Sequence, residues 1–454
     1  MVANASMAED PLAVVRSRRY LRLLLFTAIL GVPISAAAYW FLWAVHHGER
    51  WIFEALPTLL GFEAAPAWWP LPVLALGGLI AATAIGYMPG KGGHSPADGF
   101  QAGAPPKPAE LPSILLAALA SLCFGAVIGP EGPLVALGSG LAALALWLRK
   151  APDQVIAVVG AAGAFAAVAF LLGSPIVGAF LMLEATGLTK PKAKVVLLPG
   201  LLCAGIGFLV ALGLHSWTGA GKVSLTISNV PSLTHLTVVE FLWAIGFGVG
   251  AAVMGASIRS LALLVRPRAE QRPMVMTPVA GLGIGALALV YSQITGNGTG
   301  DVLFSGEESL PRFVQSAGTY TVEALALVIV CKGLAYSIAL GSFRGGPVFP
   351  AIFLGATAGI LFAHLPGLPV TAGIAMGMGT MAAVMLRMPM TAVLLASLLL
   401  GPEGIVAMPL VIVAIVVGFV VVEWLAPSEP AGESNKPHRP MGSSSSTEGV
   451  NRLQ

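Results

Sequence analysis

The segment 129–133 reads Gly-Pro-Glu-Gly-Pro, a carboxylate framed by helix breakers within apolar sequence. The flanking residues 111–128 and 134–148 contain no charged side chain. A glutamate at membrane depth costs several kcal/mol unless it faces water or a partner, and backbone leaves a helix there only where it lines a cavity or is buried in protein. Pro133 suits the first turn of a new helix, whose free N–H groups and dipole attract negative charge. The sequence therefore predicts an anion site that contains the titratable group of Glu131.

The composition indicates an all-α integral membrane protein. Of 454 residues, 56% are hydrophobic and only 10% are charged, with a mean hydropathy of +0.86, whereas soluble domains carry about 25% charged residues. The 55 glycines and 34 prolines favour closely packed and interrupted helices. A net charge of +3 is too small to predict nucleic-acid binding. Cys123, Cys203 and Cys331 lie in apolar segments and are interpreted as small core residues.

Long apolar segments fill the chain from residue 20 to residue 425, which is enough for ten or more crossings at about 20 residues each. Residues 1–19 form a basic N-terminal tail whose arginines precede the first apolar run, so the positive-inside rule places this tail in the cytosol. Residues 426–454 are polar, rich in serine and proline, and predict a disordered tail.

An internal repeat is visible within residues 20–425. A Gly/Pro break at 129–133 and another at 345–350 each open a segment rich in small residues, and a second break follows about 40 residues later in both cases. Paired broken helices in two halves predict an inverted-repeat transporter with its site near the membrane midplane. The halves would cover about 70–215 and 236–425; chance similarity in a chain rich in glycine and proline is the alternative.

Three loops, 92–96 (Gly-Gly-His-Ser-Pro), 129–133 and 345–350 (Gly-Gly-Pro-Val-Phe-Pro), resemble those of the CLC family of chloride channels and chloride/proton exchangers. The resemblance covers about residues 20–425. It implies a CLC-type inverted repeat with many tilted and broken helices, a homodimer with two pores, and helix N-termini that converge on chloride or a similar small anion. By resemblance the anion-binding residues are His94, Ser95, Gly129, Pro130, Gly132, Gly345, Gly346, Pro347, Val348 and Phe349.

Glu131 matches the gating glutamate of that family, which the resemblance makes both the gate and the proton carrier. The alternative is an ordinary loop glutamate near the membrane surface. Pro130 replaces the usual basic residue before this glutamate, and Arg344 is a charge that the usual pattern lacks. We hypothesise that Arg344 supplies the positive field lost at position 130; a loop arginine without such a role is the alternative.

Other departures from the family pattern concern chloride and proton binding. The chloride-binding serine aligns with His94 or Ser95, and the family's tyrosine is missing near Gly404. Ala185 stands where many exchangers carry a second glutamate, and the preceding Glu184 is interpreted as structural, with proton entry as the alternative.

Lys332 lies in the middle of an apolar segment. A lysine in such a setting usually pairs with a carboxylate or with helix carbonyls, or faces water. We therefore interpret Lys332 as support for the second-half loop and not as a direct anion contact.

The sequence thus predicts an anion transporter in a bacterial plasma membrane. Channel-like conduction is slightly favoured by Ala185 and the missing tyrosine, a proton-coupled chloride antiporter is the alternative, and fluoride export is more distant. No enzyme is expected, because the chain offers no credible nucleophile and base for an intramembrane enzyme. No metal site or cofactor is predicted, and the expected partners are the anion, protons, membrane lipid and a second copy of the chain.

Overall fold

The computed structural model describes residues 15–187, 190–218, 225–227, 230–233 and 236–426. Most of both predicted tails, residues 1–14 and 427–454, lies outside these ranges. Within them the regular elements are helices, which confirms the all-α prediction. They are α2 (Arg18–Arg50), η1 (Trp51–Ala55), α3 (Leu56–Leu59), α4 (Pro70–Tyr87), η2 (Pro96–Asp98), α5 (Leu111–Leu122), α6 (Glu131–Trp147), α7 (Asp153–Leu172), α8 (Pro175–Thr186), α9 (Lys190–Thr218), α10 (Val238–Gln271), α11 (Pro273–Thr295), η3 (Thr299–Asp301), α12 (Leu310–Gln315), η4 (Ala317–Thr319), α13 (Val322–Ser342), α14 (Val348–Phe362), α15 (Val370–Leu386), α16 (Pro389–Leu400) and α17 (Pro402–Leu425).

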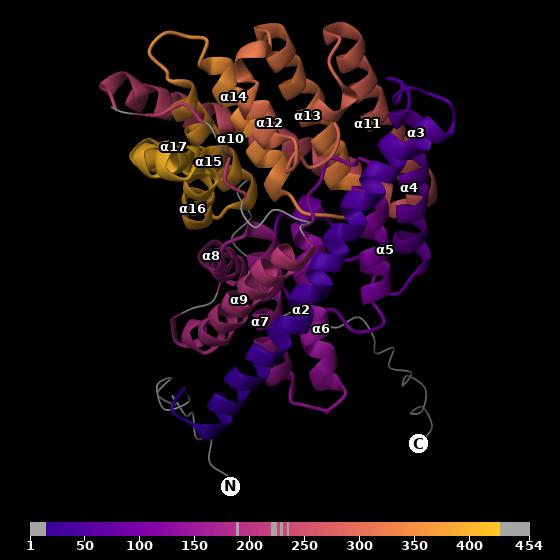
Figure 1. Cartoon of the computed structure of the whole chain (residues 1–454), viewed down its shortest axis with the longest axis vertical. Helices are drawn as coiled ribbons and strands as arrows, with labels where there is room; N and C mark the ends of the chain where they lie inside the picture. The colour runs from indigo at the N-terminus through magenta and orange to yellow at the C-terminus, as the bar shows by residue number, and fades with distance from the viewer. Residues whose placement is uncertain (1–14, 188–189, 219–224, 228–229, 234–235, 427–454) are drawn as a thin grey trace, which may run out of the picture.

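Among the described residues, eight helical segments are long and apolar enough to cross a membrane. Six shorter apolar helices, α5, α6, α8, α14, α15 and α16, lie between them. In Figure 1 the long α2 runs from the lower end of the molecule, near the N-terminus, towards α3 and α4, while α6–α9 lie low and α12–α17 lie high. Helices too short to span must meet end to end inside the protein, so their termini are available for a buried site.

Two apolar runs are each divided into a pair of helices by a left-handed residue followed by proline. The run 154–188 breaks at Gly173, with φ 60°, before Pro175 opens α8. The run 370–400 breaks in the same way at Arg387, with φ 58°, before Pro389 opens α16. A left-handed residue after the last turn is an expected signal for the end of a helix, and proline at the first helical position is an expected signal for its start.

The two halves also share the backbone that starts their helices. Pro130 caps α6 with φ −82° and ψ −3°, and Pro347 caps α14 with φ −93° and ψ −1°. Pro152 and Pro369 cap α7 and α15 in extended conformations that agree within 5°. Equivalent helices therefore begin alike in the two halves, which supports the predicted repeat; its outer boundaries stay a prediction.

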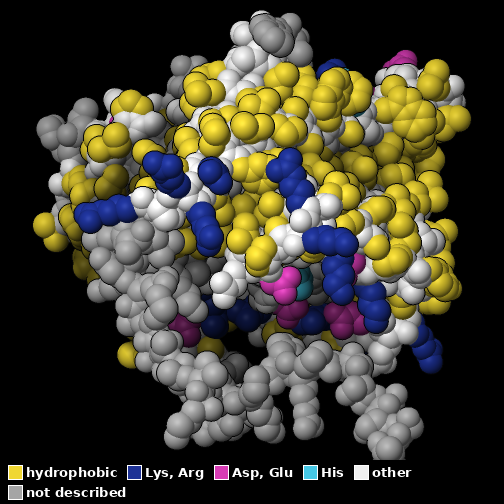
Figure 2. Space-filling model, turned by 90° about the horizontal axis from the view of Figure 1, so that it is seen from below, with side chains coloured by type: hydrophobic (Ala, Val, Ile, Leu, Met, Phe, Trp, Pro, Cys, Tyr) yellow, Lys and Arg dark blue, Asp and Glu magenta, His cyan; other side chains and the backbone are white. Residues whose placement is uncertain are grey.

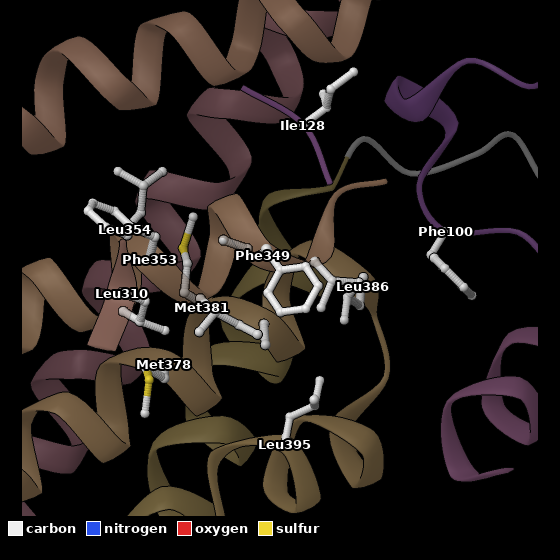
Figure 3. Packing of buried hydrophobic residues seen from close by; sticks show 14 of the residues in the cluster. Phe100, Ile128, Leu310, Phe349, Phe353, Leu354, Met378, Met381, Leu386 and Leu395 are labelled. Carbon is white, nitrogen blue, oxygen red and sulfur yellow. The ribbon is translucent and has the colours of Figure 1, made fainter. Parts of the chain in front are cut away.

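Helices α14 and α15 pack closely because glycines face one another. A Cβ atom at Gly355 would overlap the carbonyl oxygen of Gly377, and α6 and α7 meet in the same way at Gly138 and Gly163. Figure 3 shows part of the core that these helices form, with Phe349 and Phe353 of α14, Met378 and Met381 of α15, and Leu395 of α16. The close packing fixes where α14 begins, and that end forms part of the candidate site.

Candidate functional site

The loops that open α6 and α14 meet in a short antiparallel bridge. The N–H group of Gly129 donates to the carbonyl of Gly346 at 2.7 Å, and the N–H group of Gly346 donates back to Gly129 at 2.6 Å. A reciprocal pair is the arrangement expected of equivalent residues on either side of a pseudo-twofold axis. The two hydrogen bonds hold the N-termini of α6 and α14 beside each other.

Glu131 is the first residue of α6, and only 1% of its surface is exposed. Its Oε1 atom accepts a hydrogen bond of 3.0 Å from the backbone N–H of Phe349, in the first turn of α14. Its Oε2 atom is buried without a hydrogen-bond partner. The carboxylate therefore lies at the N-terminus of the helix from the other half, where helix geometry favours a negative group.

The glycines around Glu131 leave room for its carboxylate. A Cβ atom on Gly346 would lie 2.8 Å from Cδ of Glu131 and would overlap Oε2, and a Cβ atom on Gly129 would overlap both carboxylate oxygens. Gly132 and Gly345 also approach closely, because a Cβ atom on Gly132 would lie 2.8 Å from the Gly345 carbonyl. Gly129 and Gly346 thus border the carboxylate position directly, while Gly132 and Gly345 pack against each other beside them.

At the start of α14, Pro347, Val348 and Phe349 are buried. Pro347 has no N–H, so the groups that α14 can offer to an anion begin with Val348 and Phe349. The hydroxyl of Tyr336 donates to the Pro347 carbonyl at 2.6 Å. Tyr336 was not among the predicted site residues; it is fully buried in α13 and close enough to interact electrostatically with Glu131. A tyrosine inside an apolar helix, 11 positions before Pro347, was the available signal, because a buried phenol needs a partner.

The loop 92–96 differs at its two candidate anion ligands. His94 is exposed, whereas Ser95 is 5% exposed and its buried Oγ has no hydrogen-bond partner. An unpaired buried hydroxyl is uncommon and is consistent with a bound ion or water. The loop is tied to α5 through the N–H of Gly92, which donates to Oγ of Ser113 at 3.2 Å. Of the two candidates, Ser95 has the environment of a ligand.

Arg344 lies beside the loop 92–96, with its Cγ atom 3.3 Å from the Cβ position of Gly92. It is 5% exposed, its Nη1 donates to the Phe343 carbonyl, and its Nε has no partner. The charged groups that act on it are Glu270, Arg266 and Asp98, and Glu131 is not among them. The contacts that the structure gives for the Arg344 side chain are with this loop and with the Phe343 carbonyl, and its role as a source of positive field for the anion site stays a prediction.

Lys332 is fully buried, and its ammonium group contacts the carbonyls of Asp301, Val302, Leu303 and Phe304 at 2.9–3.3 Å. It also lies 4.4 Å from the ring centre of Phe353 in α14. The residue thus holds the segment 301–304 against α14. The hydrogen bonds of its ammonium group go to this segment and not to the loop 345–350.

Glu184 lies in the last turn of α8 and caps the N-terminus of α16. Its oxygens accept from the N–H of Met390 at 3.0 Å, from the N–H of Thr391 at 2.8 Å and from Oγ1 of Thr391 at 2.5 Å. A carboxylate that is engaged in three such bonds stabilises a helix start. Glu131 and Glu184 therefore share one arrangement, in which a glutamate of the first half lies at a helix N-terminus of the second. No group of three His, Cys, Asp or Glu side chains within the described part of the chain is placed to hold a metal.

The family model for voltage gated chloride channels matches residues 77–423. Similar proteins include the YfeO ion-transport proteins of Salmonella newport (strain SL254), 26% identical over 78% of this chain and 84% of the relative, and of Escherichia coli O1:K1 / APEC, 26% identical over 78% and 82%. The fold is similar to a slow cyanobacterial Cl⁻/H⁺ antiporter (TM-score 0.72, 20% identity, 89% of this chain and 95% of the other). It is also similar to a CLC-type fluoride/proton antiporter (0.65, 20%, 89% and 95%).

Proposed function

The chain belongs to the voltage-gated chloride channel (CLC) family, and from this premise we propose that it exchanges chloride for protons, with Glu131 as gate and proton carrier. Anion transport by a multi-pass membrane protein is the family's activity and agrees with the eight candidate spans. The finer statement, proton coupling, is supported by the buried carboxylate and by the two antiporters among the similar structures.

The observation that carries the proposal is the position of the Glu131 carboxylate at the N-terminus of α14. An anion and the ionised carboxylate would compete for the same N–H groups. A protonated carboxyl group is a weaker acceptor than a carboxylate, so proton binding releases these donors. Chloride then takes the vacated place, and movement of the side chain carries the proton. Binding of a proton and binding of an anion are in this way linked through one residue.

Channel-like conduction, which the sequence slightly favours, is the second candidate. It rests on Ala185, next to Glu184, and on the absence of a tyrosine near Gly404. The three hydrogen bonds to Glu184 agree with its structural role and leave the route by which protons would reach Glu131 unassigned. Exchange is preferred because both similar structures described above are named as antiporters, and both are coupled to protons.

The experiment reconstitutes the purified protein in chloride-loaded liposomes and records chloride efflux and proton uptake together. We expect proton uptake in a fixed ratio to chloride, and Glu131→Gln should abolish proton movement while chloride flux continues. Chloride efflux without protons in the wild type would favour the channel, and the absence of any chloride flux would refute both. Replacing chloride by fluoride in the same assay tests the more distant alternative, fluoride export.

We further propose that the protein forms a homodimer, lies in a bacterial plasma membrane and has no enzymatic activity. The enterobacterial relatives support the bacterial setting. Crosslinking in native membranes, followed by mass measurement, tests the dimer.

A further inference from the structure

Arg259 of α10 is a half-buried arginine whose side chain forms no ion pair or hydrogen bond with any residue that the structure describes. The charged groups that act on it are Arg387, Asp98 and Glu423. Both acids already have an arginine partner, because Arg387 pairs with Glu423 at 3.5 Å and Arg266 pairs with Asp98. The positive charge of Arg259 is therefore not neutralised by a direct contact.

The wider cluster repeats this imbalance. Four arginines, Arg259, Arg266, Arg344 and Arg387, interact with three acids, Asp98, Glu270 and Glu423. Arg266 pairs with both Asp98 and Glu270, and Arg387 pairs with Glu423, so among the described residues two of these arginines, Arg259 and Arg344, have no carboxylate partner. Arg344 donates to the Phe343 carbonyl instead, which in the described structure leaves Arg259 as the member of the cluster without a hydrogen bond or ion pair. Figure 2 shows Lys and Arg side chains gathered in a band across the lower face of the molecule, next to a group of Asp and Glu, with hydrophobic side chains around them.

A small cavity joins Arg259 to the candidate anion site. Its free volume is only about 10 Å³, roughly that of one water molecule, and its lining includes Arg259 of α10, Pro96 and Ala97 of η2, Leu340 of α13, and Pro347. Pro347 caps α14, so one wall of this cavity is the helix start at which Glu131 lies. The residue just before Pro96 is Ser95, whose buried Oγ has no partner.

We propose that Arg259 recruits the transported anion at one mouth of the pathway. This inference rests on the proposed function. Chloride binds beside the unpaired guanidinium at the opening of this cavity, and the cavity, which is narrower than the ion, widens to let it pass between η2 and α13 to the start of α14. Arg259 is not expected to contact the proton carrier, so its contribution is to anion entry and not to coupling. The paired arginines Arg266 and Arg387 hold the walls of the mouth in place.

The expected size follows from one unit charge at a partly hydrated site. A charge about 5–7 Å from the passing anion, at a dielectric near that of water, changes the local anion concentration about threefold, and a drier site raises this towards tenfold or more. The effect should appear in the apparent KM for chloride and should shrink as ionic strength rises.

The test changes the charge at position 259 after folding. Arg259→Cys is reconstituted in liposomes and treated with a methanethiosulfonate reagent that carries either a trimethylammonium or a sulfonate group. The three native cysteines are buried, so the wild type should be unaffected by either reagent. We expect the cationic adduct to lower the apparent KM for chloride at least threefold relative to the anionic adduct, with the proton-to-chloride ratio unchanged.

Arg268→Cys is the matched control. Arg268 is exposed on the same helix, is absent from the cavity lining, and lies nine residues further along, which is about 13 Å of helix. This exceeds the Debye length of about 8 Å at 0.15 M salt, so the adduct charge at position 268 should not change KM. Equal KM values for the two adducts at position 259 would overturn the role of Arg259 alone, whereas an inactive wild type would overturn the proposed function as well.

Discussion

Replacing Gly346 by alanine should force Glu131 out of its position and thereby open the gate. The added Cβ atom would lie 2.8 Å from Cδ of Glu131 and would overlap Oε2, whereas the next neighbour, the backbone nitrogen of Gly132, is 3.0 Å away. The side chain is the flexible partner, so it should yield before the bridge between Gly129 and Gly346 does. The alanine should therefore destabilise the state in which the Glu131 carboxylate caps the N-terminus of α14.

The magnitude follows from the hydrogen bond that is lost. Glu131 accepts from the N–H of Phe349, and a hydrogen bond to a charged group contributes about 1.5–3 kcal/mol. Removing it shifts the balance between the capped and released states by about 10- to 150-fold, since 1.4 kcal/mol is about a factor of ten. We expect Gly346→Ala to raise chloride efflux from liposomes and to lower the number of protons moved per chloride.

Two controls identify the cause. Gly333→Ala lies in α13, where an added Cβ atom meets no atom within 4 Å, so flux and coupling should stay at wild-type values. In a Glu131→Ala background the clash is absent, so adding Gly346→Ala should change chloride flux little. The reasoning is refuted if Gly346→Ala keeps wild-type coupling, or if its effect is equally large without the Glu131 side chain.

Two further predictions concern residues that the structure assigns to stability. Lys332→Met should lower the free energy of unfolding by about 2–4 kcal/mol, because four carbonyls of the segment 301–304 lose their donor; thermal unfolding in detergent measures this, and the exposed Lys107→Met should have little effect. Glu184→Ala should destabilise the protein by about 1–2 kcal/mol through loss of the cap on α16, with proton coupling per chloride unchanged. A loss of coupling in Glu184→Gln at unchanged stability would instead support proton entry at this residue.

Much of the fold could be predicted because its signals are local. Apolar length predicts spanning helices, and Pro or Gly at 129–133 and 345–350 predicts where helices begin, as Pro130 and Pro347 confirm. The environment of Arg344 could not be predicted, since its neighbours Asp98 and Glu270 come from distant segments. Tyr336 is a different case: its partner, the Pro347 carbonyl, is only 11 positions away, and the turn between α13 and α14 brings the two groups together.

The sequence by itself determined that Glu131 is a costly carboxylate at a helix N-terminus within a membrane protein. It did not determine which helix would receive the carboxylate. Tertiary structure decided that, since the donor is the N–H of Phe349, 218 positions away in the other half. Hydropathy and helix-breaking residues act over a few neighbours, whereas the bridge between Gly129 and Gly346 and the glycine contacts of α14 act across the whole fold. Arg259 was not among the predicted site residues for the same physical reason, because the cavity that it lines is built from segments that are distant in the sequence.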